Sequence, residues 1–153
     1  SLELSQQDTL VLLVNERYKI PENLYIDHNV FQLASSNMIT PDIRIYSTEG
    51  STPTLRVQFY TQEEKPVYDN MDFNWNYKND TLRFDNYIKL AGQWRAQRVT
   101  LTLYLPENKK VLLPSQTSQY LRNLRDFDRG VRSRLNKDKI LLIMQDGKLQ
   151  PLM

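Results

Sequence analysis

Apolar and polar residues alternate one by one along several stretches of this chain. The longest stretch runs from Val99 to Leu105, where Val, Leu, Leu and Leu alternate with Thr, Thr and Tyr. Because successive side chains of a strand point to opposite faces, this pattern predicts a strand with one buried face. The same spacing, in residues that strands favour, recurs at Ile43–Ile45, Leu55–Phe59, Phe73–Tyr77, Leu82–Phe84 and Ile140–Met144.

The N-terminal third is patterned less regularly. Thr9–Val14 is a short and nearly continuous apolar run, consistent with a strand that is buried on both faces. Leu24–Ile26 and Val30–Leu33 are expected to form a hairpin across Asp27-His28-Asn29.

Turn residues separate the predicted strands. Thr48–Pro53 and Gln62–Pro66 follow two of them, and Lys78-Asn79-Asp80 has the length of a hairpin connection. Asp146-Gly147 is typical of a tight turn that returns the chain to Leu149.

One segment has a different period. Between Ser115 and Leu135 the apolar residues recur every three or four positions, and arginines occupy the other faces. This spacing predicts a helix, capped by Ser115 or Ser118 and weakened by Gly130.

Together these patterns predict a single mainly β domain over residues 1–153. Residues 1–113 and 140–149 are expected to be mostly strands, and 115–135 a helical or irregular basic segment. Strands every 10 to 15 residues favour stacked sheets or an irregular β-solenoid, with a β-sandwich as the alternative and one C-terminal helix covering an end. Open edge strands would permit a homo-oligomer.

The composition limits the chemistry. At 153 residues with 40% hydrophobic content, the chain suits one globular domain with a core of its own. It has no cysteine, and His28 is its one histidine, so zinc sites and catalytic triads lack their usual residues. Its four glycines form no phosphate-binding motif. We therefore expect no enzyme activity, no metal and no cofactor.

The N-terminus and the hydropathy of the chain indicate how it relates to a membrane. No apolar run is long enough to cross a membrane. Ser1 stands where an initiator Met would be, and no signal-peptide pattern follows it. The expectation is a processed chain or fragment whose membrane anchor lies upstream.

Charge is unevenly distributed. Residues 95–139 hold eleven Lys or Arg against four acids, a net +7 in a chain whose net charge is +2. On the predicted helix, Arg122, Arg125, Arg129 and Arg132 would form one stripe, a candidate docking site for anionic lipid head groups or an acidic protein. The alternative is a solvated face partly neutralised by Asp126 and Asp128. Nucleic-acid binding through this basic third is the least favoured hypothesis.

Aromatic residues gather between Tyr60 and Tyr104 and include both tryptophans. Trp75 and Trp94 are the candidates for an aromatic surface that binds carbohydrate. Asp69, Asp72, Asp80 and Asp85 lie nearby and are the candidate carboxylates for a carbohydrate-active domain. Because Phe73, Trp75 and Tyr77 share one strand face, packing in the core is the favoured interpretation.

Three motifs carry a family resemblance. They are Asp80-Thr81-Leu82-Arg83-Phe84-Asp85-Asn86-Tyr87, Trp94-Arg95-Ala96-Gln97-Arg98-Val99 and Leu103-Tyr104-Leu105-Pro106-Glu107, followed by the ending Met144-Gln145-Asp146-Gly147-Lys148-Leu149. Over residues 55–113 and 140–149 the chain resembles the C-terminal β-rich tail of bacterial phage-shock-protein-C-type (PspC) membrane proteins.

The resemblance implies a setting and not a catalytic site. It implies a non-enzymatic interaction or scaffold domain in an envelope-stress system, tethered to the inner membrane on its periplasmic side, with the cytoplasmic side as the alternative. The partner would be a protein or anionic lipid. A carbohydrate-binding or carbohydrate-active β domain remains the alternative function.

Overall fold

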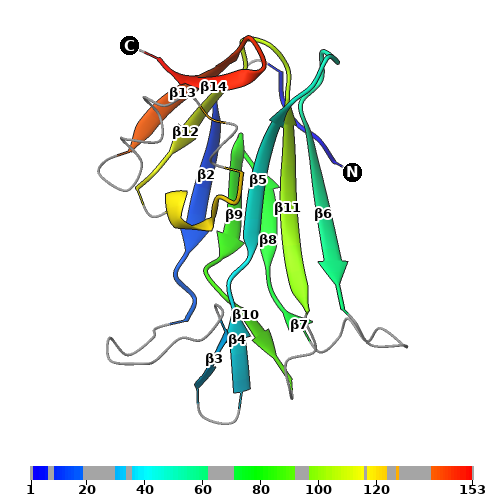
Figure 1. Ribbon diagram of the computed structural model, residues 1–153, viewed down its shortest axis with the longest axis vertical. Coiled ribbons are helices and arrows are strands. Elements are labelled where there is room, and N and C mark those ends of the chain that lie inside the picture. Colours follow the sequence, from blue (N-terminus) through cyan, green and yellow to red (C-terminus); the bar gives the residue numbers. More distant parts are fainter. Residues whose placement is uncertain are drawn as a thin grey trace.

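The computed structural model describes residues 2–6, 9–18, 30–33, 36–61, 71–91, 97–115, 117–123, 127 and 139–152, and they form three β-sheets (Figure 1). The first sheet has the order β1 (Leu2–Glu3), β6 (Thr54–Tyr60), β11 (Arg98–Leu105), β5 (Asp42–Ser47). The second has the order β14 (Lys148–Pro151), β13 (Ile140–Gln145), β12 (Lys110–Leu113), β2 (Leu10–Asn15), β9 (Thr81–Asp85), β8 (Trp75–Lys78). The third, at one end, has the order β3 (Val30–Leu33), β4 (Ser36–Ile39), β10 (Ile88–Leu90), β7 (Met71–Asp72).

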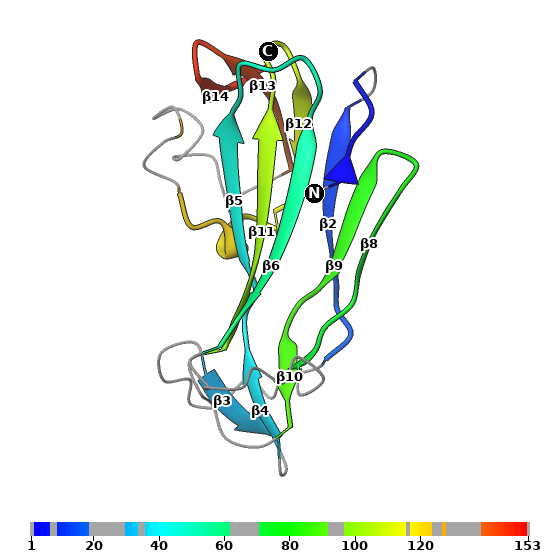
Figure 2. The same ribbon diagram turned by 90° about the vertical axis from the view of Figure 1, so that its right-hand side faces the viewer.

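The first and second sheets pack around one hydrophobic core. Leu101 and Leu103 of β11 and Leu12 and Leu82 of the second sheet are all fully buried and belong to the same cluster. In Figure 2 the strands β5, β11 and β6 form one layer, and β2, β9 and β8 form another beside it. The prediction of a mainly β fold is therefore confirmed, and packed sheets are the observed arrangement.

The arrangement is not a clear solenoid. Parallel pairs occur, but β2 pairs with β9 and β12, and β5 pairs with β11, so the partners are far apart in sequence. In a solenoid each repeat contacts its sequence neighbours. The alternation of side chains defines the faces of a strand but not its partners, which is why the sequence favoured stacked sheets and an irregular solenoid equally.

The predicted hairpin turns are present. Asn79 and Asp80 join β8 to β9, and Asp146 and Gly147 join β13 to β14. All four have positive φ, the conformation that a two-residue type I′ turn requires. Leu24–Ile26 lies outside the described residues, and β3 pairs with β4, a strand that the alternation did not predict.

The predicted C-terminal helix is not seen. Of residues 115–135, the structure describes 115, 117–123 and 127, and they form a single 3₁₀ turn at Ser118–Tyr120. The chain then extends, so that Leu121 forms a parallel bridge with Ile43. Leu121 and Phe127 are buried. At Leu121 the backbone pairs with the edge of β5, and this pairing competes with helix formation for the same backbone groups.

Asn123 closes the edge of β5. Its side-chain amide donates to the carbonyl of Ile45, and its side-chain oxygen accepts from the amide of the same residue. The backbone amide of Arg122 donates to the carbonyl of Ile43 at 2.9 Å. These bonds satisfy edge groups of β5 that a further strand would otherwise pair with.

The core packing predicts that substitutions on the inner face of the first sheet lower the stability of the domain far more than substitutions on its outer face. Replacing the fully buried Leu103 by Ala is expected to lower the free energy of unfolding by about 3 kcal/mol, because the substitution leaves a cavity. Gln58→Ala, on the exposed face, is the control and is expected to change it by less than about 0.5 kcal/mol. Urea unfolding measures both, and equal effects would contradict the assignment of the faces.

Candidate interaction surface

The outer face of β5, β11 and β6 presents arginine and tyrosine side chains. The strand register places them in rows across the sheet: Tyr46 beside Tyr104, then Arg44 and Arg56 on either side of Thr102, then Arg98 beside Tyr60. The residues between them along the strands point inward and include Ile45, Leu55, Leu101 and Leu103, all buried. In Figure 2 these three strands lie side by side. Because the alternate residues of these strands are buried on the inner side, the residues between them must point to the outer side.

Arginine and aromatic groups contact one another on this face. The Arg98 guanidinium carbon lies 4.4 Å from the centroid of the Tyr60 ring, a cation–π geometry. The rings of Tyr46 and Tyr104 stack with centroids 6.2 Å apart. Nη1 of Arg44 lies 3.5 Å from the Tyr46 hydroxyl, at the limit of a hydrogen bond. These contacts order long side chains that would otherwise be mobile.

The positive charge of this face is not neutralised. Among the described residues, Arg44, Arg56 and Arg98 form no ion pair. The one carboxylate at an outward position of these strands, Asp42, accepts a hydrogen bond from Nε of Arg122 at 2.8 Å. We call the outward residues of the three strands (Arg44, Tyr46, Arg56, Gln58, Tyr60, Arg98, Thr100, Thr102 and Tyr104) the arginine–tyrosine face.

The sequence analysis did not single out this face. Its residues were visible as the polar positions of alternating strands, but register decides which of them become neighbours. The alternation along each strand does not show that Arg44 and Arg56 lie two strands apart in one row. Nor does it show that Arg98 lies on the central strand between theirs.

Arg122, the first of the predicted docking residues, has a structural role. Besides Asp42, it bonds the Gln119 carbonyl and the Thr40 hydroxyl, at 3.1 and 3.3 Å, and 28% of its side chain is exposed. It anchors the segment after the 3₁₀ turn to the edge of the first sheet. Arg125, Arg129 and Arg132 lie outside the described residues, so the predicted stripe stays a prediction.

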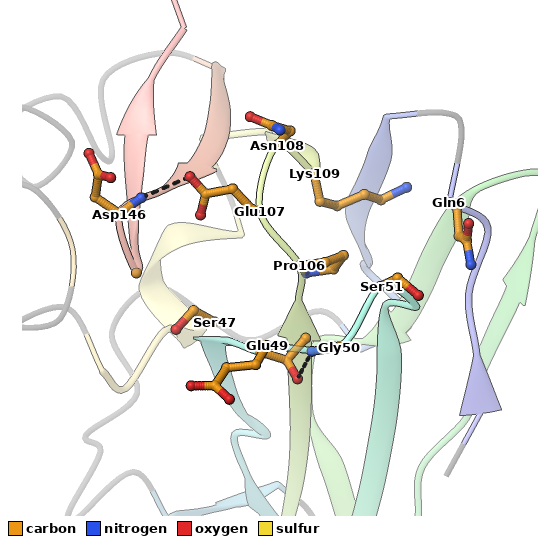
Figure 3. Close-up of a pocket in the computed structure, with 12 residues that line it drawn as sticks. Gln6, Ser47, Glu49, Gly50, Ser51, Pro106, Glu107, Asn108, Lys109 and Asp146 are labelled. Atoms are coloured by element: carbon orange, nitrogen blue, oxygen red, sulfur yellow. Dashed lines mark hydrogen bonds between the residues drawn. The ribbon is translucent and has the colours of Figure 1, made fainter.

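A polar hollow lies between the loops at the other end from the third sheet (Figure 3). Its volume is about 870 Å³, and its lining includes Glu49, Glu107, Lys109 and Asp146. Glu107 accepts a hydrogen bond from the Asp146 amide at 3.1 Å, and Lys109 donates to the Ser5 carbonyl at 2.7 Å. These polar groups are used to hold the loops together.

The candidate aromatic surface is only partly described. Trp75 is half-buried and packs against the core, which agrees with a packing role. Trp94 lies outside the described residues.

The candidate carboxylates do not form an acid–base pair. Asp80 accepts from the Tyr77 hydroxyl, and Asp69 lies outside the described residues. Asp72 and Asp85 meet at Arg17, whose guanidinium binds both oxygens of Asp72 at 2.9 Å and one oxygen of Asp85 at 3.0 Å. A shared guanidinium partner makes this an ion-pair network that connects the second sheet to β7 of the third.

The network satisfies a buried charge. Asp85 is 1% exposed and also accepts from the Asn74 amide at 2.8 Å and from Asn15 at 3.3 Å. Hydrogen bonds from Arg17 hold the pKa of Asp72 below its usual value. Burial, aided by the Asp72 charge, raises the pKa of Tyr18 to about 12. A buried carboxylate is tolerated because each partner is in place.

The fold and this surface define a three-sheet β domain with a cationic, aromatic face. A family described as "ToastRack found in some PspC" matches residues 26–151, most of the chain. The chain therefore belongs to the ToastRack family of domains found in some PspC proteins, and the resemblance seen in its motifs is confirmed. The match extends beyond residues 55–113 and 140–149 and includes the arginine-rich segment.

No curated protein and no solved structure matches the chain. Within the described residues, no helix has the length and apolar character needed to span a bilayer.

The ion-pair network predicts how stability depends on pH. The folded pKa of Asp72 lies below the value of 3.8 expected without its partners. The stabilisation is therefore complete above that value and is lost as the pH falls through the lower folded pKa. The gap in unfolding free energy between the wild type and Asp72→Asn is expected to narrow as the pH is lowered below about 4.

Urea unfolding at a series of pH values measures this gap. In an Arg17→Gln background the same Asp72→Asn substitution should produce a much smaller pH-dependent difference, because the guanidinium that lowers the pKa is gone. A wild-type gap that stays constant with pH would contradict the assignment.

Proposed function

We propose that this chain is a non-enzymatic interaction domain of a PspC-type bacterial membrane protein and acts in the response to envelope stress. Its membership of a domain family found in PspC proteins supports the membrane-protein setting. The observation that carries the interaction role is the arginine–tyrosine face, where three arginines lie on an ordered sheet with no ion-pair partner among the described residues.

The face has the properties of a binding platform. Its side chains project from strands whose inward residues are buried along β11 and at Ile43, Ile45 and Leu55, which holds the backbone in place there; Phe59, at the end of β6, is 38% exposed. Sites on rigid elements hold their geometry better than sites on loops, and they lose less conformational entropy on binding. The periplasmic side of the inner membrane is the location that we propose for it.

A charge reversal of the face tests the role in stress signalling. In cells that carry the membrane protein containing this domain, we expect Arg44→Glu, Arg56→Glu and Arg98→Glu together to change the induction of envelope-stress transcripts by a protonophore at least several-fold. The reason is that like charges at an interface oppose association. Transcript levels give the response, and immunoblots check that the variant protein accumulates normally.

Lys78→Glu, Arg83→Glu and Lys110→Glu form the matched control. These exposed residues lie on the second sheet, and the triple variant has the same net charge as the face variant. If both variants respond like the wild type, the proposed role of the face is wrong. A catalytic turnover that is lost on substitution of Asp72 or Asp85 would contradict the non-enzymatic assignment.

The absence of cysteine from this chain makes the location directly testable. In the carrier protein, with any cysteine elsewhere replaced, Gln58→Cys should react with a membrane-impermeant maleimide while the inner membrane is intact, because Gln58 is exposed. Leu103→Cys, at a fully buried position, should react only after denaturation. Labelling of Gln58→Cys only after the inner membrane is lysed would place the domain in the cytoplasm.

A further inference from the structure

We propose that the arginine–tyrosine face lies flat against an anionic phospholipid surface, with Arg44, Arg56 and Arg98 binding separate lipid phosphates. The inference rests on the proposed interaction role and names the partner of that face. It uses side chains of the described strands and does not involve Arg122, which is held by Asp42, or the rest of the arginine-rich segment.

The contacts within the face limit what it can bind. Carbohydrate and nucleobase binding by stacking needs an open aromatic ring face. Here the Arg98 guanidinium covers one face of Tyr60, and Tyr46 and Tyr104 stack on each other, which reduces the open aromatic area. The face also carries many hydrogen-bond donors, the guanidinium groups and the tyrosine hydroxyls. These donors suit phosphate oxygens.

The arrangement of the arginines suits several anions in one plane. Arg44 and Arg56 flank Thr102 in one row, so their Cα atoms are about 10 Å apart, two strand separations. Arg98 lies four residues from Thr102 along β11, a distance of about 13 Å. The three arginines do not lie on one line, so together they outline an area of the sheet. An extended acidic peptide follows a line, whereas lipid phosphates form a two-dimensional layer.

The remaining residues suit an interface between water and lipid. Tyrosine is enriched where one end of a side chain meets apolar groups and the other meets water. Tyr60 is 44% exposed, and the half-buried Tyr46 and Tyr104 lie three rows further along the sheet. Within β5, β11 and β6 the one outward carboxylate, Asp42, is paired with Arg122; Glu3 of the short strand β1 lies beside Thr54 at the edge of the same face, outside the rows of the three arginines.

Flotation of the purified chain with vesicles tests the proposal. We expect binding to vesicles of phosphatidylglycerol and phosphatidylethanolamine at low salt, weaker binding at physiological salt, and none to phosphatidylcholine alone. Arg44→Gln, Arg56→Gln and Arg98→Gln together should lower the partition coefficient about a hundredfold, since each basic side chain near an anionic surface contributes roughly fivefold.

The control is Lys78→Gln, Arg83→Gln and Lys110→Gln, which removes the same charge from exposed positions of the second sheet. It should retain most of the binding. Equal losses in the two variants would show binding through net charge alone and overturn the assignment to this face. Circular dichroism checks that both variants fold.

A single cysteine gives a second, independent readout. An environment-sensitive fluorophore on Gln58→Cys, in the middle of the face, should shift to shorter wavelength when anionic vesicles are added. The same fluorophore on Asn76→Cys, exposed on β8, should not shift. A shift at position 76 alone, or at neither position, would contradict the proposal.

A labelled polyglutamate peptide distinguishes the lipid surface from an acidic protein. Peptide binding that the three face substitutions abolish, without vesicle flotation, would overturn the lipid proposal. If, in addition, the glutamate-substituted face variant alters the stress response in cells, the proposed interaction role stands with a protein partner. If flotation and the stress response are both unaffected, both proposals fail.

Discussion

The central constraint in this domain is that β11 must bury every second side chain. Val99, Leu101, Leu103 and Leu105 are fully buried between the first and second sheets, and β11 pairs with β6 on one side and β5 on the other. Strand geometry then sends the intervening residues outward. The polar face is thus the necessary counterpart of the core, and any substitution that shifted the register of β11 would exchange the two.

Two local devices support this arrangement at its boundaries. Asn123 and the Arg122–Asp42 pair close the β5 edge, so that the backbone of an otherwise open strand is hydrogen-bonded. At the other side of the molecule, Arg17 links Asp85 at the end of β9 to Asp72 on the third sheet. Both devices use charged or amide side chains where backbone pairing ends. They account for several polar residues that would otherwise suggest a catalytic or docking role.

The arginine–tyrosine face and the membership of the ToastRack family are two independent observations on the function of this domain. The family gives the setting of a membrane protein, and the face gives a cationic, aromatic surface whose arginines have no ion-pair partner among the described residues. Lipid binding of this kind would be modest for an isolated domain, because three basic residues contribute only about 3 kcal/mol at an anionic surface. Tethering to the same membrane would raise its effective concentration there. A face that binds lipid weakly would therefore suit reversible contact with the membrane surface.

The sequence by itself determined the mainly β class, the six alternating strands, the positions of two hairpin turns and the family, because side-chain period and turn chemistry are local properties. It assigned Leu121 to a helix, whereas this residue forms a parallel bridge with Ile43, and the burial of an apolar residue does not by itself distinguish the two. The pairing of β2 with β9 and of β5 with β11 was decided only in the tertiary structure. So was the arginine–tyrosine face: Arg44 lies 54 residues before Arg98, and only the register of β5, β11 and β6 places them on one surface.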